Sequence, residues 1–291
     1  MFEQIAHNSL NKVTSTLKSL YSLRVNKIHK FQSKVNIEIK MGPFLLKTAS
    51  TVAELKKALR LRYQVFYCEL QGTPQNLGFD VDEFDFICDH LIIIDKKNQK
   101  TVGTYRLNCS QFNTEFYSEN EFNIDRLKKL PLIKLELGRA CIHKEYRTGV
   151  VIALLWKGIG EYMNKTNSDL LFGCASIKTS SPREAALLYR LFYEQNRLKP
   201  EFLTPPSIKF SMPQLDLWIQ RFNAPLSEEE KLEAQKLIPP LFRAYLKIGA
   251  YVGGAPAWDP DFKCIDFLTI LNKEDLNKSL WKKYKLHSES F

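Results

Sequence analysis

The segment 134–164, KLELGRACIHKEYRTGVVIALLWKGIGEYMN, sets the architecture of this chain. Its first nine residues, 134–142, carry apolar side chains at positions 135, 137, 141 and 142, which favours a β-strand. Residues 150–163 instead place apolar side chains three and four positions apart, which is the spacing of an amphipathic helix. The basic loop between them ends in a glycine where the helix should start. Free N–H groups and the helix dipole make such a joint a candidate anion-binding site.

Two polar residues within the expected strand, Glu136 and Arg139, raise a question of orientation. Residues three apart face opposite sides of a regular strand. A bulge near Gly138 would add a residue, bring both side chains onto one face and leave a backbone N–H pointing into a cleft. An ordinary strand, with the carboxylate facing inward and the arginine outward, is the alternative. Local sequence leaves both open.

The composition is that of a soluble globular protein, with 291 residues, 44% hydrophobic and 25% charged. The longest aliphatic runs, such as 91–94, are far too short to span a bilayer, and no secretory signal follows Met1. Six cysteines without a CxxC pair favour buried, reduced thiols in a cytosolic protein, so neither a metal site nor a disulfide framework is expected. The net charge of +10 suits nucleic acid, an anionic membrane or an acidic protein as partner.

Residues 1–42 are expected to form a basic amphipathic helical extension. Apolar residues recur at spacings of three and four up to position 35, and lysine and arginine dominate the polar positions. Such a helix can lie in the headgroup region of an anionic membrane. The alternative is a helix packed on its own domain or on a partner subunit.

The main domain is expected over residues 43–275, with an insertion at about 196–240 and a basic tail at 276–291. Thr51 and Glu54 form a capping-box signature that should open a helix. Ser181, followed by a proline and a glutamate, should open another. Short apolar runs predict strands at 44–46, 89–95, 102–107, 134–142, 170–176, 251–252 and 264–271. The predicted class is mixed α/β with one mostly antiparallel sheet flanked by helices.

An acidic loop follows the first of these helices and stands out in a basic protein. It contains Asp80, Asp82, Glu83 and Asp85. The functional interpretation is a site for an ammonium group, and the alternative is a solvated loop. His90, at the start of the next strand, is a candidate base, although a lone histidine is more often structural.

Seven segments, taken in order, resemble the ornithine-lipid N-acyltransferase group of the GNAT acyltransferase superfamily. They are RYQVF (62–66), CDHL (88–91), VGTYRL (102–107), LELGRACI (135–142), YRTGVVIALLW (146–156), LFGCAS (171–176) and FRAYLKIGAYVGGAPAWDPDF (242–262). The resemblance covers roughly residues 43–271. It implies transfer of a 3-hydroxy long-chain acyl group from acyl carrier protein to the α-amine of an amino acid, most simply ornithine, in bacterial lipid synthesis. It implies no bound cofactor, and the acyl carrier protein thioester is a co-substrate.

The related acyl-homoserine-lactone synthases imply a set of site residues. The positions that match their arginine, phenylalanine, acidic-loop and Glu-x-x-Arg residues are Arg62, Phe66, Asp82, Asp85, Arg106, Glu136 and Arg139. Within this resemblance, Asp82 and Asp85 would receive a cationic side chain. Glu136 would act as the base through a water, with Arg139 or Arg106 orienting it. Tyr189 matches the place of the tyrosine that protonates the leaving thiolate in many GNAT enzymes, and a packed tyrosine is the alternative there.

The donor loop departs from ordinary GNAT acetyltransferases. Their pyrophosphate loop has a second glycine two residues after the first, whereas Gly149 is followed by two valines. This weakens the case for the pyrophosphate of coenzyme A and suits the phosphopantetheine of an acidic carrier protein. The residues implied at the donor site are Ala140, Cys141, Ile142, Arg147, Thr148, Gly149 and Val150.

Two alternatives remain open from the sequence. Glycine or lysine could be the acceptor, or the chain could be a non-catalytic membrane- or nucleic-acid-binding protein on the same scaffold. The charge pattern and the absence of a long apolar segment place the protein in the cytoplasm, peripheral on the inner face of the membrane. With the enzyme as the preferred interpretation, no nucleic acid is expected as a partner.

Overall fold

A computed structural model describes residues 28–72 and 78–276 of the chain. The chain divides into two compact units. Unit 1 comprises Met1–Arg106 and Arg139–Leu155, and unit 2 comprises Leu107–Gly138 and Trp156–Phe291. Three elements contain residues of both units: strands β4 (Lys100–Cys109) and β5 (Lys134–Ile142) and helix α4 (Gly149–Thr166).

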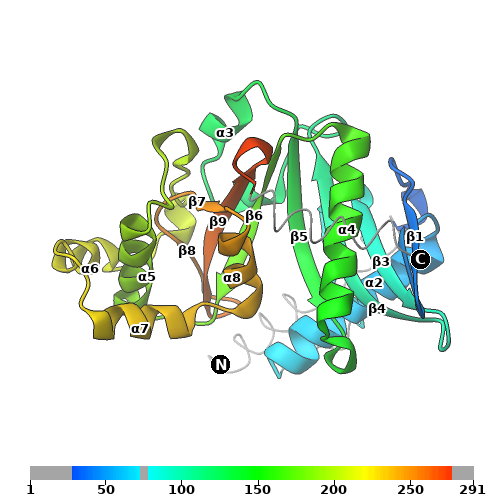
Figure 1. Cartoon of the computed structure of the whole chain (residues 1–291), viewed down its shortest axis with the longest axis horizontal. Helices are drawn as coiled ribbons and strands as arrows, with labels where there is room; N and C mark the ends of the chain where they lie inside the picture. Colours follow the sequence, from blue (N-terminus) through cyan, green and yellow to red (C-terminus); the bar gives the residue numbers. More distant parts are fainter. Residues whose placement is uncertain (1–27, 73–77, 277–291) are drawn as a thin grey trace, which may run out of the picture. The chain divides into compact units, whose positions relative to one another are not determined.

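Unit 1 contains the first strands and helix α2 (Figure 1). The strands β1 (Glu38–Met41), β2 (Phe44–Thr48) and β3 (Asp89–Asp95) pair antiparallel in that order. Four consecutive aliphatic residues of β3, at positions 91–94, are buried or nearly so, as expected for a strand covered on both faces. Helix α2 (Val52–Tyr63) begins after Thr51, whose hydroxyl accepts a hydrogen bond from the Glu54 N–H at 3.2 Å, so the predicted cap is confirmed.

Short helical turns complete unit 1. Helix α2 continues into a π-helix, η2 (Gln64–Leu70). The 3₁₀ turns η1 (Ile28–Lys30), η3 (Glu83–Phe86) and η5 (Lys144–Tyr146) lie in the connecting segments. π-Helical turns are rare and often mark functional sites, and η2 carries Phe66.

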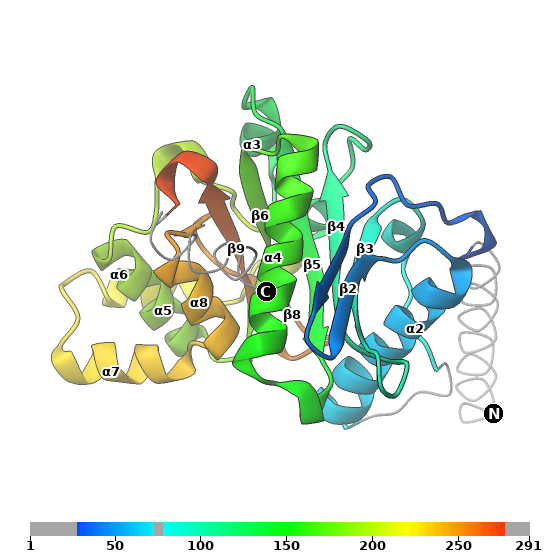
Figure 2. The same cartoon turned by 45° about the vertical axis from the view of Figure 1, so that its right-hand side comes forward.

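Unit 2 is organised around strand β9 (Cys264–Asn272). It pairs antiparallel along its length with β6 (Leu170–Ile177), and the two strands lie side by side in Figures 1 and 2. The short strands β7 (Tyr251–Val252) and β8 (Ala257–Asp259) also pair antiparallel with β9. The first residues of β5 pair with β6 in parallel, so the sheet is mixed but mostly antiparallel.

Helices cover the sheet of unit 2 and form its insertion. Helix α5 (Pro182–Glu194) starts at the predicted Ser181 cap, which accepts a hydrogen bond from the Glu184 N–H. Its apolar face packs with Phe242 and Phe267, whose rings lie 5.4 and 5.1 Å from that of Phe192. The remaining helices are α3 (Asp125–Lys129), α6 (Leu215–Arg221), α7 (Glu228–Leu237) and α8 (Pro240–Lys247). The predicted fold class, mixed α/β with flanking helices, is confirmed.

The expectation for the N-terminal extension is wrong where the structure describes it. Residues 28–41 form the turn η1 and the strand β1 rather than a continuous helix. Ile28, Phe31 and Val35 are buried. Packing of these side chains in the core stabilises the turn and the strand more than their helical spacing stabilises a helix. Residues 1–27, and 277–291 of the expected basic tail, lie outside the described residues.

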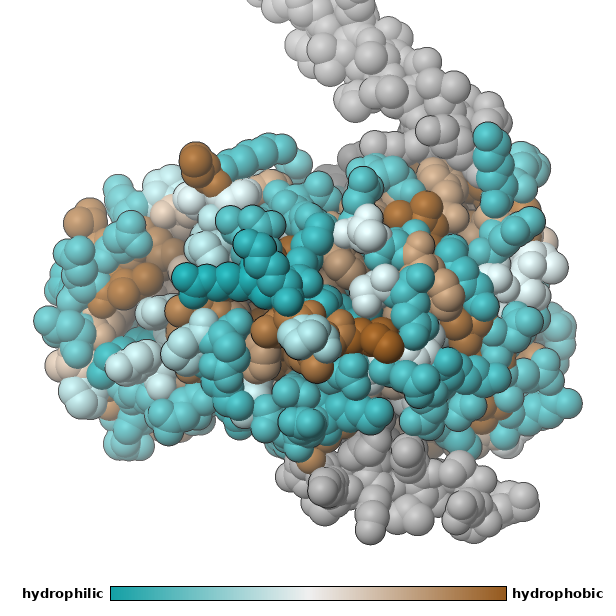
Figure 3. Space-filling view, turned by 90° about the horizontal axis from the view of Figure 1, so that it is seen from above, coloured by the Kyte–Doolittle hydropathy of each residue, from teal (hydrophilic) through white to brown (hydrophobic). Residues whose placement is uncertain are grey.

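Within the described ranges, no helix combines the length and the apolar character needed to cross a bilayer. On the face drawn in Figure 3, hydrophilic side chains predominate and hydrophobic ones lie in small groups between them. Strands β1 and β8 and helix α3 were not predicted, because elements of three to five residues are too short for a periodicity to emerge.

Candidate active site

The loop between β5 and α4 lies in unit 1 and has the predicted strand–loop–helix form. Arg147 and Thr148 at the end of this loop are exposed, as are Gly149 and Val150 in the first turn of α4. The Arg147 guanidinium pairs with the Glu69 carboxylate at 2.5 Å, and its Nε donates to the Ile142 carbonyl at 3.1 Å. These bonds hold the loop against η2. The positive end of helix α4 therefore faces solvent, as an anion site requires.

The second half of β5 has an unusual backbone at Arg139, where φ is +52°. A residue with a Cβ avoids this region, at a cost of about 1–2 kcal/mol, so a strand irregularity of the kind that the Glu136–Arg139 spacing suggested is present. It lies at Arg139, next to Gly138. Cys141, two residues further on, is buried, and burial raises the pKa of its thiol to about 12. Cys141 packs with Leu61 and Val65, and its thiol keeps its proton at neutral pH.

Arg62 has no exposed surface and lies at the centre of a buried ion-pair network. Its Nε donates to Asp80 at 2.6 Å, and its two terminal nitrogens donate to Asp85 at 2.6 and 3.1 Å. The sequence expectation placed Arg62 in contact with substrate. Its burial instead gives it the role of holding the acidic loop in place.

Two further arginines complete this network in unit 1. Arg106 donates to Asp82 at 2.6 Å and to Asp85 at 3.0 Å, and Arg139 donates to Asp82 at 3.2 Å. Burial raises the pKa of Asp82, but Arg106, Arg139 and Arg62 outweigh it and hold that pKa below its usual value. Three arginines thus face three aspartates. The three aspartates of the acidic loop are therefore paired with the protein's own guanidinium groups, whereas Glu83 is exposed.

His90 is fully buried beside the same network. Its Nε2 lies 3.1 Å from the Asp85 carbonyl oxygen, and its ring packs edge-on against Phe31. Burial, together with the charges of Arg62 and Arg106, lowers the pKa of His90 to about 4. The imidazole is neutral at pH 7 and can reach a substrate only through other groups.

Glu136 belongs to unit 2, and its carboxylate is buried. It accepts hydrogen bonds from the Tyr117 N–H at 2.9 Å and from the N–H and hydroxyl of Ser118, both at 2.7 Å. These donors compensate the buried negative charge and fix the side chain. The hydrogen bonds described here for Glu136 come from Tyr117 and Ser118, and the one described for Arg139 goes to Asp82.

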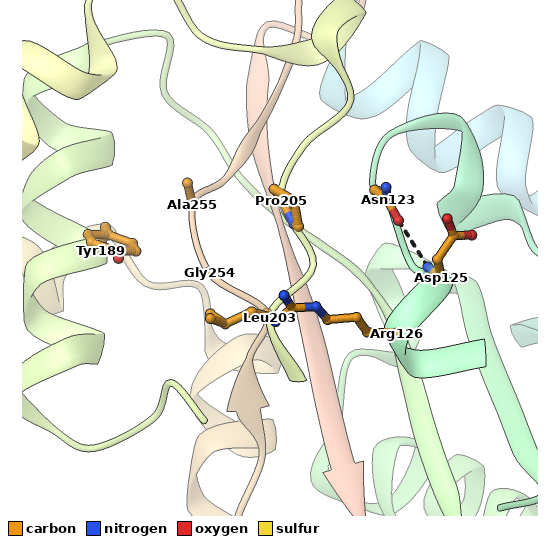
Figure 4. Close-up of a pocket in the computed structure, with 9 residues that line it drawn as sticks. Asn123, Asp125, Arg126, Tyr189, Leu203, Pro205, Gly254 and Ala255 are labelled. Carbon is orange, nitrogen blue, oxygen red and sulfur yellow. Dashed lines mark hydrogen bonds between the residues drawn. The ribbon is translucent and has the colours of Figure 1, made fainter. Parts of the chain in front are cut away.

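Tyr189, the expected proton donor, lines a pocket of about 540 Å³ in unit 2 (Figure 4). The side chain comes from α5, and Arg126 and Asp125 from α3 also line the pocket. Burial raises the pKa of the Tyr189 phenol, so it is protonated at neutral pH. A neutral phenol can donate a proton or a hydrogen bond. Phe66, by contrast, is half-buried against Leu61, Val65 and Cys141 in unit 1.

Sequence reasoning missed a second acidic cluster, in unit 2. Glu121 is buried, and its neighbours by charge are Asp266 and Asp259. Oxygen atoms of Asp259 and Asp266 and the Cys264 sulfur lie within 4.8 Å of one another. No local signal marks Glu121, because the other members lie more than a hundred residues away in the sequence.

Part of the chain matches a known protein domain. Residues 61–157 match the model of the acetyltransferase (GNAT) domain. Together with the mixed α/β fold, this match makes the chain a GNAT-type acyltransferase, which favours an enzyme over a non-catalytic binding protein.

Two curated relatives narrow the class to a family. The L-ornithine N(alpha)-acyltransferase of Rhizobium meliloti is 32% identical over 77% of this chain and 78% of the relative. The Brucella abortus protein of the same name is 29% identical over 87% of this chain and 92% of the relative. The chain belongs to the L-ornithine N(alpha)-acyltransferase family.

A solved structure of an N-acyl amino acid synthase from uncultured soil microbes covers 84% of this chain and 96% of its own. Its TM-score is 0.46 at 11% identity. A similarity of this degree says nothing about the substrate.

Proposed function

We propose that this acyltransferase moves a 3-hydroxy long-chain acyl group from an acyl carrier protein thioester to the α-amine of L-ornithine. The observation that carries the proposal is the set of relatives named for this acceptor, which match 77% and 87% of the chain in the two cases above. The reaction joins an amine to a thioester carbonyl and releases a thiol. It balances without a metal or a redox partner.

The α-amine is the better nucleophile of the two amines in ornithine. An α-amino group has a pKa of about 8, against about 10.4 for a lysine-like side chain. A larger fraction of α-amine is therefore unprotonated at neutral pH, and less free energy is needed to deprotonate it. This difference supports Nα-acylation over side-chain acylation.

The donor side of the proposal rests on the exposed loop before α4. Arg147, Thr148, Gly149 and Val150 would receive the phosphopantetheine arm, with the β5 backbone at Ala140, Cys141 and Ile142 alongside it. The oxyanion donor would come from the backbone of residues 139–141. The net charge of +10 would attract an acidic carrier protein.

The proton path is assigned to three groups. Glu136 is proposed as the base, acting through a water because its carboxylate is only 5% exposed. Tyr189 would protonate the leaving thiolate, and Arg106 or Arg139 would orient the substrate carboxylate or the base. His90 is the alternative base. Its complete burial makes it less suitable.

The product is an amphiphile, so we infer that it leaves to a membrane. Basic residues outnumber acidic ones in residues 1–27, so an anionic membrane surface would attract this segment, and the protein would then be peripheral on the inner face of the cytoplasmic membrane. Binding of the full chain to vesicles with and without anionic lipid, at low and high salt, tests this point.

The first experiment is mass spectrometry of a reaction containing the protein, 3-hydroxyacyl carrier protein and a pool of free amino acids. We expect an Nα-(3-hydroxyacyl)ornithine product. Acyl-coenzyme A and non-hydroxylated acyl carrier protein serve as comparison donors. A glycine or lysine adduct would keep the chemistry and refute the acceptor, and no adduct from folded protein would refute the function.

The same assay separates the two candidate bases. Glu136→Gln keeps the shape of the side chain and should reduce kcat by about 10²–10⁴-fold, whereas His90→Gln should change it much less. The reverse order would assign the base to His90. A thermal melt of each variant shows whether it is folded.

A further inference from the structure

Unit 2 contains a group of acidic side chains that none of the steps above uses. Its members are Glu121, Asp259 and Asp266, with the thiol of Cys264 among them, and we call it the β8–β9 acidic cluster. Asp259 and Cys264 are partners in the pairing of β8 with β9, and Asp266 follows two residues later on β9. The strand pairing therefore brings these three side chains together. Their ligand atoms lie within 4.8 Å of one another, which is the convergence a cation needs.

Glu121 supplies the second, independent observation. The residue is 3% exposed, and its Oε2 atom has no hydrogen-bond partner. The Cys174 thiol and Tyr117 lie beside this carboxyl group, and the thiol donates its hydrogen to the Ser118 hydroxyl. Neither Glu121 nor Asp259 forms an ion pair within the described residues. An unsatisfied buried oxygen costs free energy, which a bound ligand that donates to it would recover.

The electrostatics agree with this geometry. Burial and the neighbouring carboxyl groups of Asp266 and Asp259 raise the pKa of Glu121 to about 8, so Glu121 is mostly protonated at pH 7 and its ionised form needs a compensating cation. Asp266 is itself held by the Ser176 hydroxyl, which donates to it at 2.6 Å. Ser176 is exposed and Asp259 is half-buried. The cluster therefore has a route to solvent, although its deepest member is enclosed.

We propose that the β8–β9 acidic cluster binds the side-chain ammonium of the amino-acid acceptor. This rests on the proposed function and assigns the part of it that selects a basic amino acid. An ammonium group donates three hydrogen bonds, which suits three carboxyl groups at one place. The acceptor's cation then goes to this cluster and not to Asp82 and Asp85, whose oxygens already accept from arginines.

A metal ion is the competing occupant. Burial and the charges of Asp266 and Asp259 raise the pKa of the Cys264 thiol far above its usual value, so the thiol keeps its proton. A thiophilic metal such as zinc, bound through Cys264, would need the thiolate. An ammonium group needs only oxygen acceptors and leaves the thiol as it is. The ammonium is therefore the occupant that the group fits without a change of protonation at Cys264.

The test compares ornithine with norvaline, which has the same carbon skeleton but no side-chain amine. Both are supplied together to the full-length enzyme with 3-hydroxyacyl carrier protein, and the two products are measured by mass spectrometry. Glu121→Gln and Asp266→Asn should each reduce kcat/KM for ornithine by about 10- to 100-fold, the range for losing a hydrogen bond to a charged group. Turnover of norvaline should change by less than about threefold. Glu229→Gln, which neutralises an exposed acid on α7, is the matched control.

Several outcomes overturn the proposal. The proposal is wrong if Glu121→Gln and Asp266→Asn keep the wild-type preference for ornithine. It is also wrong if they reduce the acylation of ornithine and of norvaline equally. Asp82→Asn is made alongside, and loss of the preference there but not in Asp266→Asn would return the ammonium to the Asp82 loop.

A binding measurement covers the case in which the wild type acylates neither amino acid, which would refute the proposed function itself. Thermal melts of the free, chelator-treated protein are recorded with ornithine, norvaline, or zinc chloride. Ornithine should raise the Tm of the wild type and not that of Asp266→Asn, and norvaline should raise neither. No shift with ornithine, or a shift with zinc alone that Asp266→Asn abolishes, would overturn the ammonium site.

Discussion

The two acidic clusters of this protein contain similar groups in different surroundings. Asp80, Asp82 and Asp85 in unit 1 face Arg62, Arg106 and Arg139, and their charges are matched. Glu121 and Asp259 in unit 2 form no ion pair within the described part of the chain. The pKa of Asp82 is lowered while that of Glu121 is raised to about 8. Burial raises the pKa of both groups, so the difference between their pKa values comes from their partners, which are arginines for Asp82 and other carboxyl groups for Glu121.

The two clusters also differ in the free energy needed to bury their carboxyl groups. A buried carboxylate with an arginine is stable only as a pair, and removing one partner leaves a buried charge. A buried carboxyl group without a cation avoids that penalty by keeping its proton. Loss of one partner should therefore destabilise the fold in the first arrangement, whereas the carboxyl group of the second can change its protonation state. Substitutions at Arg62, Glu121, Asp82 and Ser176 test this difference.

The largest effect is expected in the matched cluster. Arg62→Met leaves Asp80 and Asp85 buried without their main partner and should lower the free energy of unfolding by about 3–5 kcal/mol. Urea unfolding measures it. Arg60→Met is the control, because Arg60 is exposed and its guanidinium contacts only the Phe79 ring among the interactions described, at 5.0 Å, so its loss should cost less than about 1 kcal/mol.

A double variant sharpens this test. Adding Asp85→Asn to Arg62→Met removes one of the uncompensated charges and should recover part of the loss. Equal destabilisation by Arg62→Met and Arg60→Met, or strict additivity of the two changes at 62 and 85, would contradict the paired cluster.

The next effect is a pH dependence of stability that Glu121→Gln should remove. The carboxyl group ionises near 4.5 in the unfolded chain but keeps its proton to about pH 8 in the folded one. Between these values the folded state binds more protons, so the free energy of unfolding falls as pH rises, by at most about 1.4 kcal/mol per pH unit. Denaturant unfolding at several pH values from 5 to 8 measures the slope. A variant with the wild-type slope would show that Glu121 does not titrate in this window.

Asp82→Asn is the matched change in the other cluster, and its sign is opposite. Because the folded pKa of Asp82 lies below its usual value, its contribution is present above about pH 4 and is lost as the pH falls through the folded pKa. The variant should therefore differ from wild type by a constant amount between pH 5 and 8.

The smallest effect concerns Ser176, whose hydroxyl donates to Asp266. Ser176→Ala should cost about 1 kcal/mol of stability and raise the KM for ornithine about two- to fivefold, because Asp266 is less well positioned. Ser211→Ala is the control, since Ser211 is an exposed serine of the same unit that bonds to the Ser207 carbonyl. An unchanged KM would separate Ser176 from the acceptor site.

Much of the fold followed from local signals. The caps at Thr51 and Ser181, the strand at 134–142 and the helix after Gly149 lie where the sequence predicted them. Caps and side-chain periodicity act over a few residues, so a sequence displays them directly. The helical expectation for residues 28–40 failed because Ile28 and Phe31 are buried in one cluster with residues distant in the sequence, such as Ala49 and Leu55, which no local pattern reports.

The candidate site was less accessible to prediction. The sequence identified Arg62, Asp82, Asp85, Arg106 and Arg139 as a group, and the structure does bring them together, but as partners of one another. It marked Tyr189, which lines a pocket, and did not mark Glu121. The sequence shows which side chains are charged but not which groups surround them in the folded protein.

The sequence by itself determined the class of fold, the place of the central strand–loop–helix and the family to which the chain belongs, since these depend on local periodicity, caps and ordered motifs. Only the tertiary structure decided which acidic residues are neutralised. That outcome depends on burial and on pairs such as Arg62 with Asp85 and Ser176 with Asp266, which join residues 23 and 90 positions apart. Electrostatic free energy falls with distance in space and not with separation along the chain, so the two clusters become different only once the chain has folded.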